Sequence, residues 1–251
     1  MDTKDKWFAA STIAVILGSL LGFILILGMV WADFEGSLFL PSLIGEKYVV
    51  KNLNCPALMT RNETRHISLT LSNSRENEQS RFVEGMISEG DIRQTRVIKQ
   101  EVTIAPGAKE EVTWEIYPED AAYDKVVFFH VYVKRAYSAP SLEGTCGVLV
   151  LDIPFLSGIQ VMGIVLGLIF FLILGGNSIL LFQYQKDLMG PRRRYMWRAM
   201  FAMSILTVLG IWTSIMGYWE FGFFFWFSSF AILVYLAART MVNMVFGSQN
   251  T

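Results

Sequence analysis

The chain has 251 residues, of which 53% are hydrophobic and 17% charged, and its mean hydropathy is +0.42. An average soluble domain contains about 25% charged residues, so this composition excludes disorder and argues against a soluble globular protein. Two histidines and two cysteines leave little material for haem, copper, iron–sulfur or zinc sites. We therefore expect membrane spans interrupted by a more polar domain, with no metal, cofactor or catalytic set.

Four long uncharged runs predict four transmembrane helices, because about 20 helical residues cross the hydrocarbon core. We predict spans over residues 7–32, 155–185, 199–219 and 221–240, the last two forming a tight helical hairpin. The first run follows Lys4 and Lys6, as in a signal peptide. It is longer than a signal-peptide core and has no clear cleavage site, so we expect a retained helix and keep cleavage as the alternative.

Charge predicts the topology of these spans. The polar island, residues 33–154, holds 13 basic and 18 acidic residues, a net charge of −5. The other eight basic residues lie within residues 1–6 and 186–198 or near the end of the fourth span. Short basic loops stay in the cytoplasm. We therefore expect a multi-pass protein of the plasma membrane, with both termini (residues 1–6 and 241–251) in the cytoplasm and the island outside.

Within the island the hydrophobic period changes to two, which is typical of strands. Apolar residues alternate with polar ones through residues 66–71 and 111–116, and turn signals separate about seven strand-like segments. In residues 127–134 the alternation places Val127, Phe129, Val131 and Val133 on one face and Phe128, His130, Tyr132 and Lys134 on the other. This pattern favours an antiparallel β-sandwich. The predicted fold class is an α+β membrane protein, with an Ig-like sandwich inserted between the first and second transmembrane helices.

Three segments carry a resemblance to a known family. They are His66–Asn73, Glu101–Gly107 and Glu111–Ile116. Over residues 48–152 the island resembles CARDB-type and related bacterial or archaeal Ig-like domains, in which a similar strand end precedes a similar hairpin. The chain departs from the family pattern after Asn73, where a charged loop replaces the expected glycine. The resemblance implies a fold and a binding or spacer role, and no chemistry.

Cys55 and Cys146 both lie in the island. An even pair on the oxidising side of a membrane predicts a disulfide, and two buried reduced thiols are the alternative. The triplet Asn62-Glu63-Thr64 is a glycosylation sequon on the side predicted to be outside, which makes Asn62 a possible acceptor.

Small residues predict how the helices pack. Ala10, Ala14, Gly18 and Gly22 recur every four residues in the first span, and Gly163 and Gly167 repeat the pattern in the second. Such stripes let helices approach closely. We expect the two spans to pack on each other by these faces, or one stripe to pack on a partner subunit. Asn177 is interpreted as an interhelical hydrogen-bonding residue, and a polar contact in a substrate path is the alternative.

Two surfaces are candidates for contact with partners. Phe128, His130 and Tyr132 are predicted to face outward on one strand, where an exposed aromatic row would dock a partner. The alternatives are that a loop covers the row or that a register shift turns it inward. The aromatic fourth span is expected to face lipid, another membrane subunit or a bound hydrophobic ligand.

Arg192, Arg193 and Arg194 precede the third span. They are first of all a topology determinant, and their charge is also suited to anionic lipid headgroups. We do not interpret them as a nucleic-acid site.

The first functional hypothesis is a non-catalytic accessory subunit of a multi-subunit integral-membrane complex, whose outer domain docks a partner. The second is a self-assembling adhesion or scaffold protein, since the layout is similar to that of claudin-like proteins, although their Trp-Gly-Leu-Trp signature is absent. The third is a transporter or a component of a membrane enzyme. Helix cores without ionisable residues count against the third.

Overall fold

The structure is a computed structural model, which describes residues 3–39, 48–50, 52–134, 141–185 and 190–246. The chain divides into two compact units. We call residues 1–30 with 163–251 the helical unit and residues 31–162 the β-unit.

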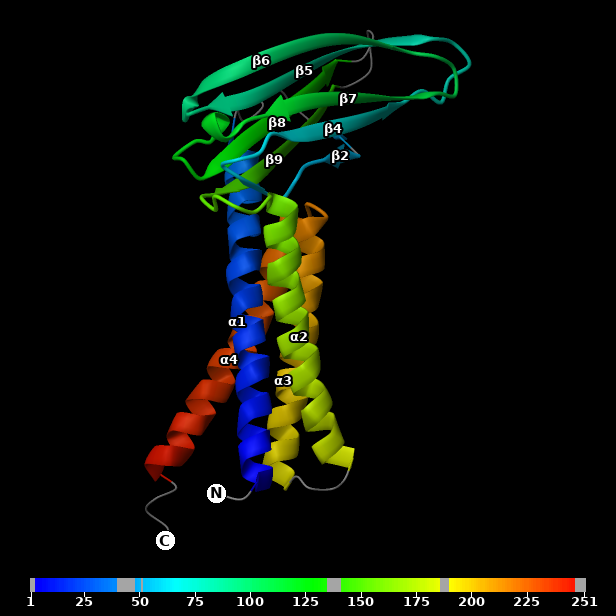
Figure 1. The fold of residues 1–251 in the computed structure, drawn as a ribbon. Coiled ribbons are helices and arrows are strands. Elements are labelled where there is room, and N and C mark those ends of the chain that lie inside the picture. The colour runs from blue at the N-terminus through cyan, green and yellow to red at the C-terminus, as the bar shows by residue number, and fades with distance from the viewer. Residues whose placement is uncertain (1–2, 40–47, 51, 135–140, 186–189, 247–251) are drawn as a thin grey trace. The chain divides into compact units, whose positions relative to one another are not determined.

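Four long helices are present: α1 (Thr3–Leu38), α2 (Gly158–Gln185), α3 (Pro191–Ile215) and α4 (Trp219–Phe246) (Figure 1). All four are long and apolar enough to cross a membrane, as the sequence predicts. Three residues separate α3 from α4, and Gly217 among them adopts a positive φ of 75° that favours glycine. The predicted tight hairpin is therefore confirmed.

The helix bounds differ from the predicted spans at every end but the last residue of α2, and three of the differences are large. α1 continues six residues beyond residue 32, and α4 continues to Phe246. Most of the basic segment, predicted as a loop over residues 186–198, is helical, because α3 begins at Pro191. Proline is favoured at the first helical position, since its fixed φ suits a helix and its missing N–H is not needed there.

The helical unit has an apolar core built from all four helices. One cluster includes Val15, Leu180, Met203 and Leu236, and a second includes Ile26, Ile173 and Ile211. The long apolar helices thus share buried side chains, while much of their remaining surface is exposed.

The β-unit contains two sheets (Figure 1). The larger sheet has the order β1-β9-β8-β5-β6, and β3 also pairs with β9. Its strands are β1 (Tyr48–Val49), β3 (Leu58–Thr60), β5 (Gln79–Glu89), β6 (Asp91–Ile104), β8 (Val126–Lys134) and β9 (Leu142–Leu151). The smaller sheet has the order β2-β4-β7. Its strands are β2 (Leu53–Asn54), β4 (Arg65–Ser72) and β7 (Lys109–Ile116).

The two sheets share one apolar core. Alternate residues of β4 and β7 supply one side of it, with Ile67 opposite Trp114 and Leu69 opposite Val112 in the antiparallel register. Alternate residues of β8, including Phe129 and Val131, supply the other side, and the Trp114 and Phe129 rings lie 5.0 Å apart. The predicted period of two is confirmed in these three strands.

The start of the island, residues 48–60, forms three short strands. Asn52, between the first two of them, adopts a positive φ of 70°, which interrupts the extended backbone. β1 pairs with the larger sheet, β2 with the smaller and β3 again with the larger. The segment therefore crosses twice between the sheets.

Candidate functional site

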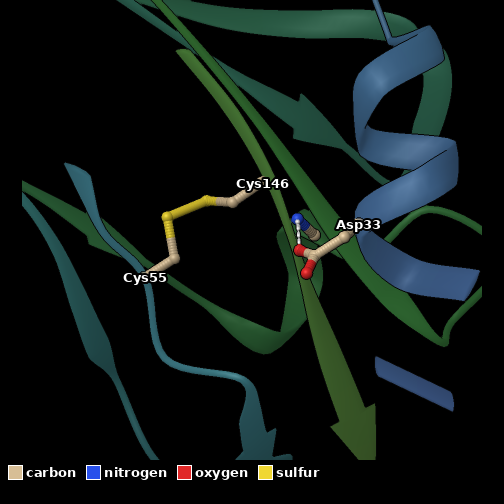
Figure 2. The surroundings of a disulfide bond; sticks show 4 residues. Asp33, Cys55 and Cys146 are labelled. Atoms are coloured by element: carbon tan, nitrogen blue, oxygen red, sulfur yellow. Dashed lines mark hydrogen bonds between the residues drawn. A yellow bond between two sulfur atoms is a disulfide. The ribbon is translucent and has the colours of Figure 1, made fainter. Parts of the chain in front are cut away.

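The disulfide between Cys55 and Cys146 is present, with 91 residues of sequence separation (Figure 2). Cys55 directly follows β2 of the smaller sheet, and Cys146 lies in β9 of the larger sheet. The bond therefore joins the crossing segment to the last strand of the β-unit. It confirms the predicted pairing.

The C-terminal end of α1 lies against β9, within the β-unit. Asp33 Oδ1 accepts a hydrogen bond from the Gly147 backbone N–H at 3.2 Å (Figure 2). A Cβ atom at Gly36 would come within 2.8 Å of the Cys146 backbone, and one at Gly147 would fall on the Ala32 carbonyl. Two glycines thus allow a helix backbone and a strand backbone to touch beside the disulfide.

The expectation of an exposed row at Phe128, His130 and Tyr132 is wrong. Phe128 is 1% exposed and His130 is 6% exposed, and Tyr132 is half-buried with its hydroxyl 2.7 Å from Ser141 Oγ. The Phe128 ring lies 5.6 Å from that of Phe39, in a cluster with other residues from the end of α1. The unpredicted extension of α1 therefore brings Phe39, which directly follows it, onto Phe128 of β8.

The small residues of α1 and α2 do not meet in the predicted way. Gly18 lies against Ile173 of α2, and Gly22 lies against Thr207 of α3. A Cβ at Gly163 or Gly167 would meet nothing within 4 Å in the described part of the chain. The close approach of α2 to α1 uses Gly176 instead, which sequence reasoning missed and which contacts the Ser11 carbonyl and Val15.

Helix geometry explains why the α1 stripe fails at its start. Each residue turns an α-helix by about 100°, so Ala10 and Gly22 lie about 120° apart around the axis. Ala10 is exposed and Ala14 half-buried, whereas Val15 is buried. Residues spaced strictly by four therefore rotate around the helix, and within about three turns they no longer lie on the face that packs.

Polar side chains join the helices inside the helical unit. Asn177 Nδ2 donates to Ser204 Oγ of α3 at 3.0 Å and to the Ile173 carbonyl at 2.9 Å. Thr207 and Ser229 hydroxyls lie 2.9 Å apart between α3 and α4. Asn177 therefore acts as a helix–helix contact in this structure.

α4 packs along a narrow line. Gly222, Ser229 and Leu236 are buried at a spacing of seven residues, which is the spacing of a single helix seam. Most of its aromatic side chains lie outside that line. Those at least 40% exposed are Phe221, Phe223, Phe224, Phe227, Phe230 and Tyr235.

The arginines before the third span differ in their surroundings. Arg193 Nη2 lies 2.7 Å from Asp5 Oδ1 of α1, and the Arg193 guanidinium lies over the Phe8 ring. Arg194 lies over the Tyr184 ring of α2. The side chain of Arg192 lies outside the described residues.

One buried charged pair in the β-unit was not foreseen. Arg96 Nη2 of β6 lies 2.6 Å from Asp120 Oδ2, which also accepts from the Tyr117 backbone N–H. Burial raises the pKa of the Asp120 carboxyl, against the lowering effects of the Tyr117 N–H and of Arg96, while nearby Glu89 raises it further. The hydrogen bond to Glu115 raises the pKa of the Tyr117 hydroxyl.

The remaining candidate residues do not form a metal site in the described part of the chain. Asn62 is exposed, and its Nδ2 donates to the Pro154 carbonyl. His66 is exposed. Among the described residues, no group of three or more His, Cys, Asp and Glu side chains could hold a metal ion.

No family model matches the chain, and no curated protein matches it. A Bacteroides uniformis β-glucuronidase structure is similar over 34% of this chain and 11% of its own, with 11% identity and a TM-score of 0.25. A Pyrococcus furiosus CARDB domain, solved with di-metal ions, is similar over 44% of this chain and 97% of its own, with 14% identity and a TM-score of 0.30.

A Listeria innocua β-glucosidase, solved with glucose, is similar over 39% of this chain and 15% of its own, with 15% identity and a TM-score of 0.28. This chain spans about a tenth of the length of the first of these structures. The expected resemblance is met in part, since a CARDB domain is among the matches. At these TM-scores none of the matches assigns a fold or a function to the chain.

Proposed function

We propose that the protein is a non-catalytic accessory subunit of a multi-subunit integral-membrane complex. The observation that carries the proposal is the amount of helix surface left for contact. α4 buries a single line of residues, and α2 exposes Gly163 and Gly167, where an added Cβ would meet nothing within 4 Å in the described part of the chain. Lipid covers such surfaces by default, but small residues on an open face also allow a partner helix to approach closely.

The composition of the helix cores supports a structural role. The predicted spans contain no Asp, Glu, Lys, Arg or His between residues 8–32, 159–182, 199–219 and 221–238. Transporters usually place ionisable residues along the substrate path. Polar side chains at two places bond one helix to another, Asn177 to Ser204 and Thr207 to Ser229.

In this proposal the β-unit is an Ig-like sandwich that holds or shields an extracytoplasmic partner. Two sheets with a common core and a disulfide support the assignment. The docking surface cannot be the Phe128 row, since that row is buried. The positive-inside distribution of charge supports the placement of this unit outside the cell.

The test is co-purification of the full chain from its native membrane in mild detergent. We expect it to migrate with other membrane proteins. Gly163→Leu with Gly167→Leu should fill the open face of α2, keep the helical circular dichroism signal and lose those proteins. Ala10→Leu with Ala202→Leu is the matched control, since these alanines are exposed on α1 and α3, outside the α2 and α4 surfaces.

A monodisperse monomer in the native preparation would overturn the proposal. Assemblies containing this chain alone would support the self-assembling scaffold instead. Loss of partners in the alanine control to the same extent would show that the α2 face has no particular role.

A further inference from the structure

The larger sheet ends at β6, the longest strand in the described part of the β-unit (Figure 1). From Thr95 to Ile104 this strand pairs with β5 without interruption, and the register shift between the two strands lies nearer their turn, after Ser88. No other strand among the described residues pairs with the far side of β6. Its backbone therefore offers a row of N–H and C=O groups to which a second strand can bond.

The other sheet edges are less suited to such pairing. β1, β2 and β3 contain two or three residues each, and a short edge strand offers few hydrogen-bonding groups. β7 contains eight residues, but Glu110, Glu111 and Glu115 lie along it, and charges of one sign repel an identical strand. β6 instead carries one charge of each sign between residues 97 and 103.

The side chains along this edge alternate between two faces of the sheet. Ile98 and Val102 pack against the apolar core that the two sheets share. The opposite, outer face carries the exposed side chains of Val97, Lys99, Glu101 and Thr103. A strand added at this edge would extend both the exposed outer row and the apolar inner row.

The sequence of this edge is complementary to itself. In an antiparallel pair of β6 strands with a twofold axis at Gln100, Lys99 of each copy faces Glu101 of the other. The same register places Ile98 opposite Val102 on the inner face. Opposite charges that face each other across two strands are favourable, and so are apolar side chains.

Neighbouring registers do not have this complementarity. A twofold axis at Lys99 would set the two lysines against each other, and an axis at Glu101 would do the same with the two glutamates. Like charges directly opposite each other are destabilising. An axis at Val97 would bring in residues 92–94, which lie in the irregular part of β6 and have no partner in β5.

The two charged side chains are held upright on the outer face by β5. Lys99 Nζ lies 3.6 Å from Glu84 Oε1, and Glu101 Oε1 accepts a hydrogen bond from Ser80 Oγ at 2.6 Å. The Lys99 side chain is nevertheless 58% exposed, and an ammonium group has three N–H donors. Lys99 can therefore keep Glu84 and also bond to a carboxylate of a second copy.

We propose that the β-unit forms a twofold-symmetric dimer with a second copy of this chain, in which the two β6 strands pair antiparallel about Gln100. The two larger sheets then become one continuous sheet. Backbone hydrogen bonds over residues 97–103 supply the affinity, and the two contacts between Lys99 and Glu101 select the register. The dimer does not depend on the proposed subunit role, since a complex can contain one copy of the chain or two.

The test is cysteine crosslinking of the full chain in isolated membranes. In an antiparallel pair the Cα atoms of opposite residues lie about 4.5–5.5 Å apart, which is within the range that a disulfide spans. Gln100→Cys should therefore form a covalent dimer under mild oxidation. The two native cysteines do not interfere, because they are bonded to each other.

Val97→Cys is the matched control. Residue 97 is exposed and residue 100 is half-buried, so random collisions would favour crosslinking at 97. In the proposed register Val97 faces Thr103, and the two copies of residue 97 lie about 20 Å apart at about 3.3 Å per residue. We expect about tenfold less covalent dimer from Val97→Cys than from Gln100→Cys, because that separation exceeds the reach of a disulfide.

Three results of this comparison would overturn the proposal. Equal crosslinking at both positions would show random collision. Crosslinking at Val97→Cys alone would show a different register, and the absence of covalent dimer from Gln100→Cys would show that the strands do not pair.

A charge exchange tests the register independently. Added to Gln100→Cys, Glu101→Lys makes lysine face lysine at two places and should lower the covalent dimer about tenfold. Adding Lys99→Glu as well restores opposite charges between the copies and should recover most of the dimer. Within each copy this third change sets a glutamate against Glu84, so recovery can come only from the contact between copies. Failure to recover would overturn the register.

The strand signal in circular dichroism and the co-purifying proteins are measured on the same variants. Loss of the dimer with unchanged partners would support the β6 contact separately from the subunit role. If the charge variants do not fold, the comparison of Gln100→Cys with Val97→Cys decides the outcome.

Discussion

Asp120 shows how a single residue in a turn can report on the folding of the β-unit. Its carboxyl is buried beside Arg96, and its backbone carbonyl accepts from Ser88 Oγ, whose oxygen in turn accepts from the Phe128 N–H. The carboxyl and the carbonyl therefore connect the turn to three strands, although the sequence shows only a Pro-Glu-Asp turn.

The raised pKa of Asp120 predicts a specific pH dependence. Because burial raises the pKa above its unfolded value, the folded state binds the proton more tightly. The contribution of this group to stability is therefore largest below the unfolded pKa and is lost as pH rises through the folded pKa. Against Asp120→Asn, whose side chain does not titrate, wild-type protein should lose relative stability as pH rises above about 4.

Thermal unfolding of both proteins across the acid range measures this difference. Glu89→Gln is the control, since this neighbouring carboxyl supplies only a smaller electrostatic effect on Asp120. A difference between wild type and Asp120→Asn that does not change with pH would contradict the prediction.

The contacts of a residue were predictable from the sequence where its side chain has one strongly preferred kind of partner. Two cysteines in a predicted extracytoplasmic domain pair with each other, and an amide in the middle of an apolar helix bonds to a neighbouring helix. The burial of Phe128 was not predictable, because Phe39, which packs on it, lies almost 90 positions earlier in a segment without strand signals.

At the scale of elements, the hydrophobic period predicted which helices and strands exist better than it predicted where they begin and end. The alternation in β4, β7 and β8 is visible in the sequence because each strand has at least one buried face. The end of α1 is not, since residues 33–38 contain two acids and one glycine, which resemble a loop. Packing against β9, with Asp33 bonded to Gly147, compensates for that weak local preference.

The disulfide should contribute strongly to the stability of the β-unit. A crosslink that closes a loop of about 90 residues removes much of the freedom of the unfolded chain, and its loss typically costs about 2–5 kcal/mol. We expect Cys55→Ser with Cys146→Ser to lower the melting temperature of the strand signal in circular dichroism by several degrees or more.

A reductant provides the control for this prediction. It should lower the melting temperature of wild-type protein to that of the double variant and leave the double variant unchanged. Wild-type melting that is insensitive to the reductant, with the bond shown to be reduced on a gel, would contradict the expected stabilisation.

At the scale of the whole molecule, four spans require both termini to lie on one side of the membrane. We expect Thr3→Cys and Ser248→Cys to react with a membrane-impermeant maleimide only after the membrane is opened. Ser74→Cys, an exposed position in the β-unit, should react in intact cells. The oxidised native cysteines do not react, so wild-type protein is the background control.

Any pattern in which Ser74→Cys and a terminal cysteine react from the same side would contradict the predicted topology. The topology stays a prediction, for which span count and the distribution of basic residues are two independent signals that agree. A partner could not be predicted from the sequence, since an apolar helix surface is suited equally to lipid and to many other helices.

The strand order of the larger sheet has a consequence for the order of folding. β1 and β3, near the start of the β-unit, pair in parallel with β9, its last strand. Cys55 likewise cannot form its disulfide until Cys146 in β9 has been synthesised. These contacts join residues far apart in the sequence, which slows folding because long loops close late. During synthesis the hairpins β5–β6 and β8–β9 can form as they emerge, but β1 and β3 can join the larger sheet only after β9 has formed. The rate at which the Cys55 and Cys146 thiols are oxidised therefore measures the final step of folding, in which β1 and β3 join the larger sheet.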